Sequence, residues 1–244
     1  MSRSTRLYFE KHAHDYSKDP KYYSLIAEEI RKTISTIECP AILDVGCGNG
    51  NFIKTLFDSG IEAHYFGTDL SIEMIKIADN KSAIYPVDFI IADGLSMPIK
   101  RGTKFDIIHI DSVLHHLIDN TRAKSIHLVK KMIEALVTLL DTNGILIVQE
   151  VFYDSYLVHS LTSFMIFYGL KVMNSLGLDF SHIDKEMKPG LEVNFFHERQ
   201  LSKLLGEYGH TDILNKTIVQ IPRAYKVALL KNRGQITFIA RRPL

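Results

Sequence analysis

The sequence contains few cysteines, and they do not lie where a disulfide framework would use them. Its 244 residues include only Cys39 and Cys47. Cys47 lies inside a glycine-rich turn, and Cys39 lies just before the strand that leads into this turn. Two thiols in these positions indicate a reducing compartment, and we therefore expect a cytoplasmic protein.

Net charge is almost absent as well. Lys and Arg number 29 and Asp and Glu number 28, which leaves a formal charge of +1 at pH 7. This balance does not favour a polyanionic partner, so we expect no nucleic-acid binding. The first six residues are not followed by the apolar core of a signal peptide. No internal repeat or low-complexity segment stands out.

The sequence also lacks a hydrophobic run long enough to cross a membrane. Residues 156–178 are strongly apolar, but His159 and Lys171 interrupt them and Asp154 precedes them. A bilayer span needs about 20 predominantly apolar residues. We therefore expect no transmembrane segment.

What remains is the composition of an ordinary globular protein. Hydrophobic residues make up 46% of the chain and charged residues 23%, and the length suffices for one large α/β domain. Strand and helix patterns alternate through residue 150, which predicts a parallel sheet with helices on both faces. The predicted fold class is therefore α/β, with a doubly wound sheet.

The most informative segment is a glycine-rich turn between a predicted strand at residues 41–43 and a predicted helix at residues 52–57. Glycine lets a ligand approach the backbone closely, and the start of a helix favours an anionic group. Asp44 precedes the first glycine by two residues, and its carboxylate would repel a pyrophosphate but hold an amino group or a positive sulfur. The glycines are Gly46, Gly48 and Gly50.

Acidic residues also follow the next predicted strands. Asp69 ends the strand at residues 65–70 and lies nineteen residues after Gly50, close to the spacing at which an open α/β sheet places a ribose-binding carboxylate. Open α/β sheets bind ligands at the carboxyl ends of their strands, so we expect these acids to surround one site. The remaining strands and acids are residues 89–92 with Asp93, residues 105–110 with Asp111, and residues 144–150 after a polar turn at 141–143.

The acid followed by the spacing Gly-x-Gly-x-Gly resembles motif I of the class I S-adenosylmethionine-dependent methyltransferases, of the type 11/12-like, small-molecule kind. The resemblance covers residues 40–150 specifically and residues 197–244 loosely. It implies a Rossmann-like, seven-stranded, mostly parallel sheet whose last strand inserts antiparallel to the rest. It also implies S-adenosylmethionine as the cofactor.

The resemblance further implies roles for individual residues. Asp93 would accept a hydrogen bond from the adenine amino group, with Gly94 and Leu95 packed beside the ring. Tyr16 would touch the methionyl end of the cofactor, although a role in packing its own helix fits this residue equally well. The full expected cofactor set is Asp44, Gly46, Gly48, Gly50, Asp69, Leu70, Asp93, Gly94, Leu95, Asp111 and Tyr16.

We expect a single methyltransferase domain over residues 1–244, built from four segments. They are an N-terminal helical cap at 1–38, a cofactor-binding core at 40–150, a helical insertion at 151–196, and a closing helix with strands at 197–244. Within the outer segments the predicted helices are residues 8–16, 22–37 and 197–208, and the predicted closing strands are residues 213–221 and 235–240.

The insertion after the fifth strand allows three interpretations of its apolar stretch at residues 156–178. As a substrate lid it caps the active site, and Phe164, Met165 and Tyr168 cover an apolar acceptor pocket. As a dimer contact it buries its apolar face against a second copy of the chain. As a membrane-surface helix it would need a Lys/Arg-rich polar face, which it lacks. We expect the lid first and the homodimer second.

Candidate general bases follow the fourth and fifth predicted strands. His115 is the first candidate and His116 the second, because histidine transfers protons near neutral pH. Glu150 ends the fifth strand and is the third. Structural roles for the histidine pair, and a backbone hydrogen bond to Glu150, are the alternatives. No Cys/His spacing matches a structural zinc site, so we expect no metal.

These observations together predict methyl transfer from S-adenosylmethionine to a small, partly apolar acceptor, with O-methylation favoured over N- or C-methylation. A methyltransferase that acts on RNA or protein is one alternative. Methyltransferases that modify amino groups of nucleic acids carry Asn-Pro-Pro-Tyr, or a close variant, after the fourth strand. Residues 111–114 of this chain are Asp-Ser-Val-Leu instead, which counts against that class. The other alternative is a catalytically inactive, cofactor-binding partner subunit.

Overall fold

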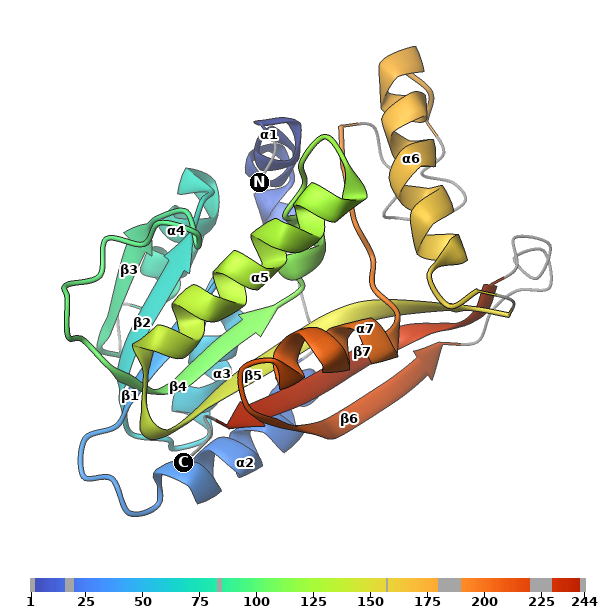
Figure 1. The fold of residues 1–244 in the computed structure, drawn as a ribbon. Helices are drawn as coiled ribbons and strands as arrows, with labels where there is room; N and C mark the ends of the chain where they lie inside the picture. Colours follow the sequence, from blue (N-terminus) through green and yellow to red (C-terminus); the bar gives the residue numbers. More distant parts are fainter. Residues whose placement is uncertain are drawn as a thin grey trace.

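The structure is a computed structural model, and it describes residues 3–15, 20–82, 85–156, 158–179, 190–219 and 230–241. Helices and strands alternate through most of these residues (Figure 1). The helices are α1 (Arg3–Lys11), α2 (Ser24–Ile34), α3 (Asn51–Asp58), α4 (Ile72–Lys81), α5 (Arg122–Leu139), α6 (Leu161–Leu176) and α7 (Glu198–Gly206). The strands are β1 (Ala41–Val45), β2 (His64–Asp69), β3 (Val87–Ile91), β4 (Phe105–Asp111), β5 (Leu140–Ser155), β6 (His210–Val219) and β7 (Leu230–Arg241).

The strands form one seven-stranded sheet in the order β3-β2-β1-β4-β5-β7-β6. The first five strands along the chain are parallel to one another, and β7 is antiparallel to both β5 and β6. The chain reverses its winding direction at β1, since β2 and β3 lie on one side of it and β4 and β5 on the other. This confirms the predicted Rossmann-like, mostly parallel sheet with an antiparallel last strand.

Each face of the sheet is covered by helices, as Figure 1 shows. Leu43 and Val45 of β1 pack into a buried cluster with residues of α5 and α7. Ile42, which points to the opposite face, packs into a second cluster with residues of α2 and α3. Alternate residues of a strand point to opposite faces, so a parallel strand covered on both sides reads as a continuous apolar run.

Strand β5 differs from its prediction, because residues 141–143 belong to the strand and not to a turn. The strand begins at Leu140 and pairs there with Phe105 of β4, next to an irregularity in the register of that pairing. At its other end β5 continues to Ser155, because β7 pairs with it from Ile145 to Ser155. Residues 141–143 lie in this irregularity, between the paired positions Leu140 and Ile145, so paired residues on both sides carry the strand across a segment with turn-favouring Asp and Asn.

The ends of several other elements differ from prediction by a few residues, and β7 begins at Leu230, five residues before its predicted start. The first helix covers Arg3–Lys11, and Ala13–Asp15 form a separate 3₁₀ turn in place of its expected continuation. Helix α2 ends at Ile34. Strand β6 begins at His210 and reaches Val219, and the last two residues of its predicted range lie outside the described residues.

Helix α6 of the insertion stands away from the sheet, at the same end of the molecule as α1 (Figure 1). Its inner side chain Leu170 packs with Tyr153 of β5 and with Leu191, Val193 and Phe195 in a third buried cluster. Within the described ranges, no helix combines the length and the apolar character that a membrane crossing requires.

Candidate active site

A cavity opens at the carboxyl ends of β1, β2, β3 and β4, and Phe9 of α1 also lines it. Eight of the residues predicted to bind a cofactor line it, namely Asp44, Gly46, Gly48, Asp69, Leu70, Asp93, Gly94 and Asp111. Gly50 and Leu95 do not line it. Tyr16 lies outside the described residues. The cavity therefore brings together acids that follow four different strands.

The glycine turn is anchored to β2 and is open toward the cavity. The backbone N–H groups of Gly46 and Cys47 donate to the carbonyl oxygen of Thr68 at 2.7 and 2.9 Å. Gly48 has φ +52°, and a Cβ atom there would meet nothing nearer than Met74 Sδ at 4.0 Å. Because Gly48 lines the cavity, any side chain at this position would occupy ligand space.

Asp69 is fixed by two backbone donors at the end of β2. Its Oδ2 accepts from the N–H of Gly48 at 3.0 Å, and its Oδ1 accepts from the N–H of Ser71 at 2.8 Å. Burial raises the pKa of Asp69, while the hydrogen bonds from Ser71 and Gly48 lower it. Each carboxylate oxygen can accept a second hydrogen bond, so Asp69 can bind a pair of hydroxyl groups while it holds the turn.

Asp93 and Gly94 form a tight part of the wall. Asp93 Oδ1 accepts from the backbone N–H of Leu95 at 3.0 Å, which explains why Leu95 supports the turn from outside the cavity. A Cβ atom on Gly94 would lie 2.5 Å from Cε of Met132 in α5. The absence of a side chain at Gly94 therefore leaves room for the end of the Met132 side chain at this wall of the cavity.

The inner end of the cavity holds two more acids with bonded partners. Asp44 is 2% exposed, and its Oδ1 lies 2.7 Å from Nδ1 of His109. Tyr23 donates its hydroxyl to Oδ2 of Asp111 at 3.3 Å, and Ser112 donates to Oδ1 at 2.8 Å. Burial, with Asp111 and Asp44 nearby, raises the pKa of Tyr23 far above its ordinary value. The phenol is therefore a hydrogen-bond donor at neutral pH.

The charge of the cavity wall has one sign. Four aspartates line it, and the described lining residues include neither Lys nor Arg. An enclosed site walled by one sign of charge favours a ligand of the opposite sign. Such a site suits a ligand that carries a positive centre and an ammonium group.

His116 lines the cavity with a neutral imidazole. It is 4% exposed, and its Nδ1 has no hydrogen-bond partner in the described structure. Burial, together with the nearby His115, lowers the pKa of His116 well below its ordinary value. The ring of Phe9 in α1 lies edge-on to it, with 5.0 Å between ring centroids. A neutral imidazole has one accepting nitrogen, so His116 can accept a proton or a hydrogen bond from a ligand.

His115 and Glu150 lie outside the cavity and bind each other. His115 Nδ1 is 2.6 Å from Oε2 of Glu150, and both side chains are almost completely buried. Glu150 Oε1 accepts from the backbone N–H of Leu114 at 2.7 Å. The N–H of Asn194 donates to the carbonyl oxygen of His115 at 2.8 Å. The pair ties the turn after β4 to β5 and to the end of the insertion.

Comparison with known families identifies the family to which this chain belongs. A family model described as a methyltransferase domain matches residues 40–186, which is more than half of the chain. The chain belongs to this methyltransferase family. The match covers the glycine turn, the acids at the strand ends and most of the insertion.

Curated relatives match less than half of this methyltransferase. A malonyl-[acyl-carrier protein] O-methyltransferase from Legionella pneumophila is 32% identical over 112 residues, which are 44% of this chain and 38% of that protein. A tRNA (carboxymethyluridine(34)-5-O)-methyltransferase from Arabidopsis thaliana is 31% identical over 107 residues, 44% of this chain and 23% of that protein. The chain thus matches well under half the length of these relatives.

Solved structures share the fold over nearly the whole methyltransferase. An S-adenosylmethionine-dependent methyltransferase from Clostridium acetobutylicum has a TM-score of 0.59 at 18% identity, over 98% of this chain and 97% of that one. A magnesium protoporphyrin IX methyltransferase from Synechocystis, solved with bound S-adenosylhomocysteine, has a TM-score of 0.57 at 19% identity, over 96% and 97%. At this level of identity the likeness concerns the fold alone.

Several lining residues of the methyltransferase were missed from sequence. The sequence places Tyr23 and Phe52 in predicted helices but gives no sign that they reach a cavity, and Met132 of α5 lies far from any motif. His109 carries a signal that was available, because a histidine interrupts an otherwise apolar run in β4. The missed lining residues include Phe9, Tyr23, Cys47, Phe52, His109 and Met132.

Proposed function

We propose that this methyltransferase uses S-adenosylmethionine to methylate an oxygen atom of a small, partly apolar acceptor. The observation that carries the proposal is the cavity at the switch point of the sheet, which joins a glycine turn to four aspartates without a Lys or Arg in its described wall. When bound, S-adenosylmethionine supplies a methyl group on a positively charged sulfur. The electrostatics of the cavity favour such a cation.

The residues present fit this cofactor group by group. Asp69 offers two accepting oxygens for the ribose hydroxyls, and Asp93 offers an acceptor for the adenine amino group. Asp44 and the open space at Gly48 suit the amino-acid end. Leu70 adds an apolar wall, and Asp111 adds a fourth carboxylate. Tyr16 remains a prediction, because it lies outside the described residues.

His116 is the group best placed to handle a proton of the acceptor. It is the only one of the three predicted bases that lines the cavity, and its imidazole is neutral with a free Nδ1. Its low pKa makes it a weak base, which suits an acceptor that ionises readily. We therefore propose His116 in place of His115 and Glu150, whose mutual hydrogen bond supports a structural role.

Oxygen is favoured as the methylated atom. The two curated relatives described above are both named as O-methyltransferases, and both names contain a carboxyl-bearing group, malonyl or carboxymethyl. A carboxylate is already ionised at neutral pH and therefore needs no strong base. This agrees with a cavity whose accessible histidine is a weak one.

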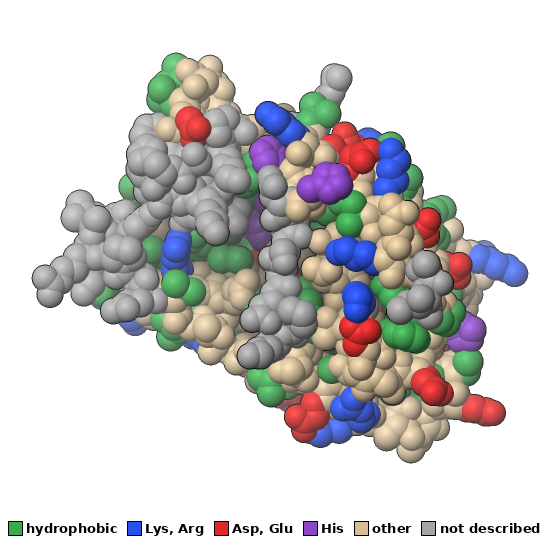
Figure 2. Space-filling model, turned by 180° about the vertical axis from the view of Figure 1, so that it is seen from behind, with side chains coloured by type: hydrophobic (Ala, Val, Ile, Leu, Met, Phe, Trp, Pro, Cys, Tyr) green, Lys and Arg blue, Asp and Glu red, His purple; other side chains and the backbone are tan. Residues whose placement is uncertain are grey.

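RNA as acceptor is the second candidate, supported by the name of the plant relative. The charge distribution favours a small molecule instead. On the described part of the face in Figure 2, Lys and Arg side chains are interspersed with Asp and Glu. Binding to a nucleic-acid backbone relies on clustered positive charge.

Three other expectations remain predictions. They are the substrate-lid role of residues 156–178, their homodimer contact, and a cytoplasmic location.

A two-part experiment tests the proposal. Titration calorimetry should show binding of S-adenosylhomocysteine, and NAD should bind more weakly or not at all. Methyl-labelled S-adenosylmethionine should then label apolar carboxylic acids or phenols more than matched amines or transfer RNA. Alkali releases the label from an ester but not from an ether or amine, which identifies the atom. Preferred binding of NAD, or labelling of amines alone, would contradict the proposal.

A further inference from the structure

A continuous row of buried polar side chains crosses four adjacent strands beneath the cavity. Asp44 of β1, His109 of β4, Gln149 of β5 and Thr237 of β7 are each 4% exposed or less. His109 Nδ1 lies 2.7 Å from Asp44 Oδ1, and His109 Nε2 lies 2.8 Å from Gln149 Oε1. Gln149 Nε2 donates to Oγ1 of Thr237 at 3.4 Å. Only the Asp44 and His109 members of the row line the cavity.

The imidazole of His109 cannot rotate freely in this position. The ring of Phe52 stacks on it with 3.6 Å between centroids and 20° between planes. The ring of Tyr23 meets it edge-on, with 6.1 Å between centroids. The Gln149 contact on Nε2 fixes the rotation of the ring in its own plane. A ring stacked on Phe52, flanked by Tyr23 and bonded at Nε2 presents Nδ1 to Asp44 in a single geometry.

Asp44 depends on this contact for its orientation. Its side chain is buried, and a buried carboxylate without hydrogen-bond partners is strongly disfavoured. Oδ1 is committed to His109, so Oδ2 is the oxygen that a ligand in the cavity can use. Other titratable groups near this end of the cavity are the carboxyl groups of Asp69 and Asp111 and the thiol of Cys47, whose pKa is raised by burial. None of them supplies a positive charge.

We infer that His109 is a positioning residue, which holds Asp44 so that its carboxylate receives the amino group of S-adenosylmethionine. The inference rests on the proposed function, since it assumes that the amino-acid end of the cofactor lies against Asp44. It assigns a binding role to a residue of a central strand that carries no motif. Gln149 acts one step further out, because it fixes the ring that fixes the carboxylate.

The test compares two ligands that differ only at the amino-acid end. S-adenosylhomocysteine carries the α-amino group, whereas 5′-methylthioadenosine keeps the adenosine and the thioether but lacks the amino acid. In His109→Leu, calorimetry should show affinity for S-adenosylhomocysteine reduced by about tenfold or more, the scale of a lost hydrogen bond to a charged group. Affinity for 5′-methylthioadenosine should stay within about twofold of wild type.

Two further variants keep the test decisive if His109→Leu does not fold. His109→Asn retains an N–H group near the position of Nδ1, and it should bind S-adenosylhomocysteine within about threefold of wild type. Gln149→Leu leaves His109 in place but removes its outer partner. It should show a smaller loss, again confined to the ligand with the amino group.

The outcomes separate this inference from the proposed function. Equal losses for both ligands, or no loss for either, would overturn the positioning role while leaving a cofactor-binding methyltransferase. His109→Asn binding as weakly as His109→Leu would also overturn it, because the retained donor would then be irrelevant. Failure of the wild-type protein to bind S-adenosylhomocysteine would overturn the proposed function itself, and this inference with it.

Discussion

At the scale of single residues, the site consists of side chains whose positions are set by backbone groups. Asp69 is held by the N–H groups of Gly48 and Ser71, and Asp93 by the N–H of Leu95. Both partners lie within a few residues of a strand end or a turn. Such local arrangements are visible in sequence, so the sequence alone predicts these acids as site residues. The role of His109 was not visible, because its partner Asp44 lies on another strand.

Gly48→Ala should abolish cofactor binding without unfolding the protein. Its φ of +52° costs an L-residue about 1–2 kcal/mol, and the added methyl group would occupy the cavity. Gly60→Ala is the matched control, because Gly60 has φ +73° and open space around it but lies outside the cavity. Thermal melts should fall similarly for both variants, while calorimetry should detect lost binding only for Gly48→Ala. Normal binding by Gly48→Ala would show that the turn does not contact the ligand.

Asp69→Ala should weaken the binding of S-adenosylhomocysteine. The ribose hydroxyls would lose a charged acceptor, and a hydrogen bond to a charged group contributes about 1.5–3 kcal/mol. Asp79→Ala, which changes an exposed acid of α4, controls for the loss of one negative charge. Calorimetry on both variants measures the difference. The ribose assignment fails if the two variants bind alike.

The neutral state of His116 makes stability depend on pH. The pKa of His116 is well below its ordinary value in the folded protein, so the unfolded chain takes up a proton near pH 6.5 and the folded chain does not. Stability from this residue is therefore present above about pH 6.5 and falls by up to about 1.4 kcal/mol per pH unit below it. Urea unfolding at pH 7.5 and 5.5 should show a smaller loss for His116→Gln than for wild type. An equal loss would mean that His116 is already protonated in the fold.

At the scale of elements, the chain follows its local signals in the core and departs from them where distant segments meet. Ser71 caps α4 and Thr121 caps α5 through their side chains, as their residue types favour. Strand β5 begins at Leu140, which pairs with Phe105 of β4, and its pairing with β7 runs from Ile145 to Ser155, so Asp141 to Asn143 lie between the two paired parts. The register of strands far apart in sequence is not encoded in either strand alone.

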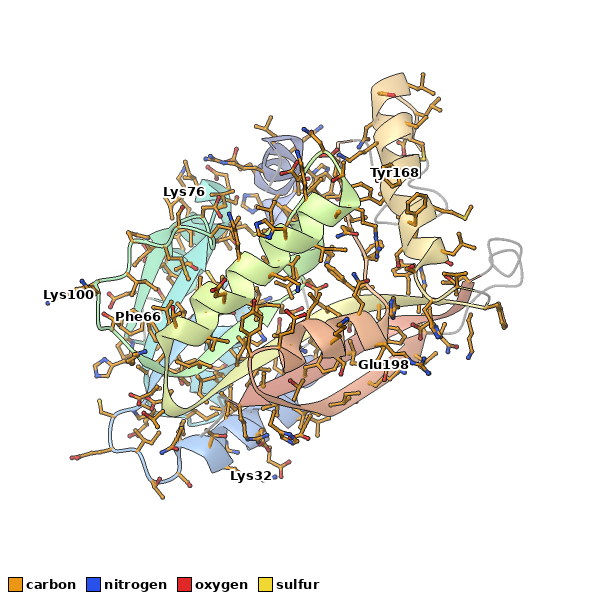
Figure 3. The ribbon with its side chains drawn as sticks, in the orientation of Figure 1. Lys32, Phe66, Lys76, Lys100, Tyr168 and Glu198 are labelled. Carbon is orange, nitrogen blue, oxygen red and sulfur yellow. The ribbon has the colours of Figure 1, made fainter. Side chains whose placement is uncertain are left out.

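Helix α6 shows that the sequence also does not determine what the apolar side chains of a helix contact. Its apolar residues were expected to face a pocket, but Phe164 and Met165 are about half exposed, and none of the described α6 residues lines the cavity. Figure 3 shows Tyr168 on the part of α6 that projects away from the sheet. The helix attaches instead through Phe167 and Leu170. A sequence pattern identifies an apolar face but not what covers it.

The exchange of amide hydrogens should distinguish the two main roles of α6. The helix has few buried side chains, so its amides should exchange faster than those of β4 and β5. If α6 is a lid, S-adenosylhomocysteine together with an accepted carboxylic acid should slow its exchange, while the cofactor product alone should have less effect. Mass spectrometry of peptides from α6 provides the measurement. Protection that is present without ligands and disappears on dilution would identify a dimer contact instead.

At the scale of the whole molecule, the order of the sheet was predictable and the contents of the cavity were only partly so. Alternating strands and helices with an acid at each strand end specify a doubly wound sheet, and the observed order agrees. The cavity, however, also takes Phe9 from the N-terminal helix and Met132 from the middle of α5. These residues reach it through tertiary packing, which no local motif records.

The insertion of β7 between β5 and β6 also sets an order of events during synthesis. Among the described residues β6 pairs only with β7, so it has no strand partner until residues 230–241 have been translated. Ribosomes add about 5–20 residues per second, and the nascent chain therefore carries the exposed Ile213 and Ile218 of β6 as an unpaired strand for about a second or more. The five parallel strands can assemble first, and the last strand then closes the sheet from within and not at its edge.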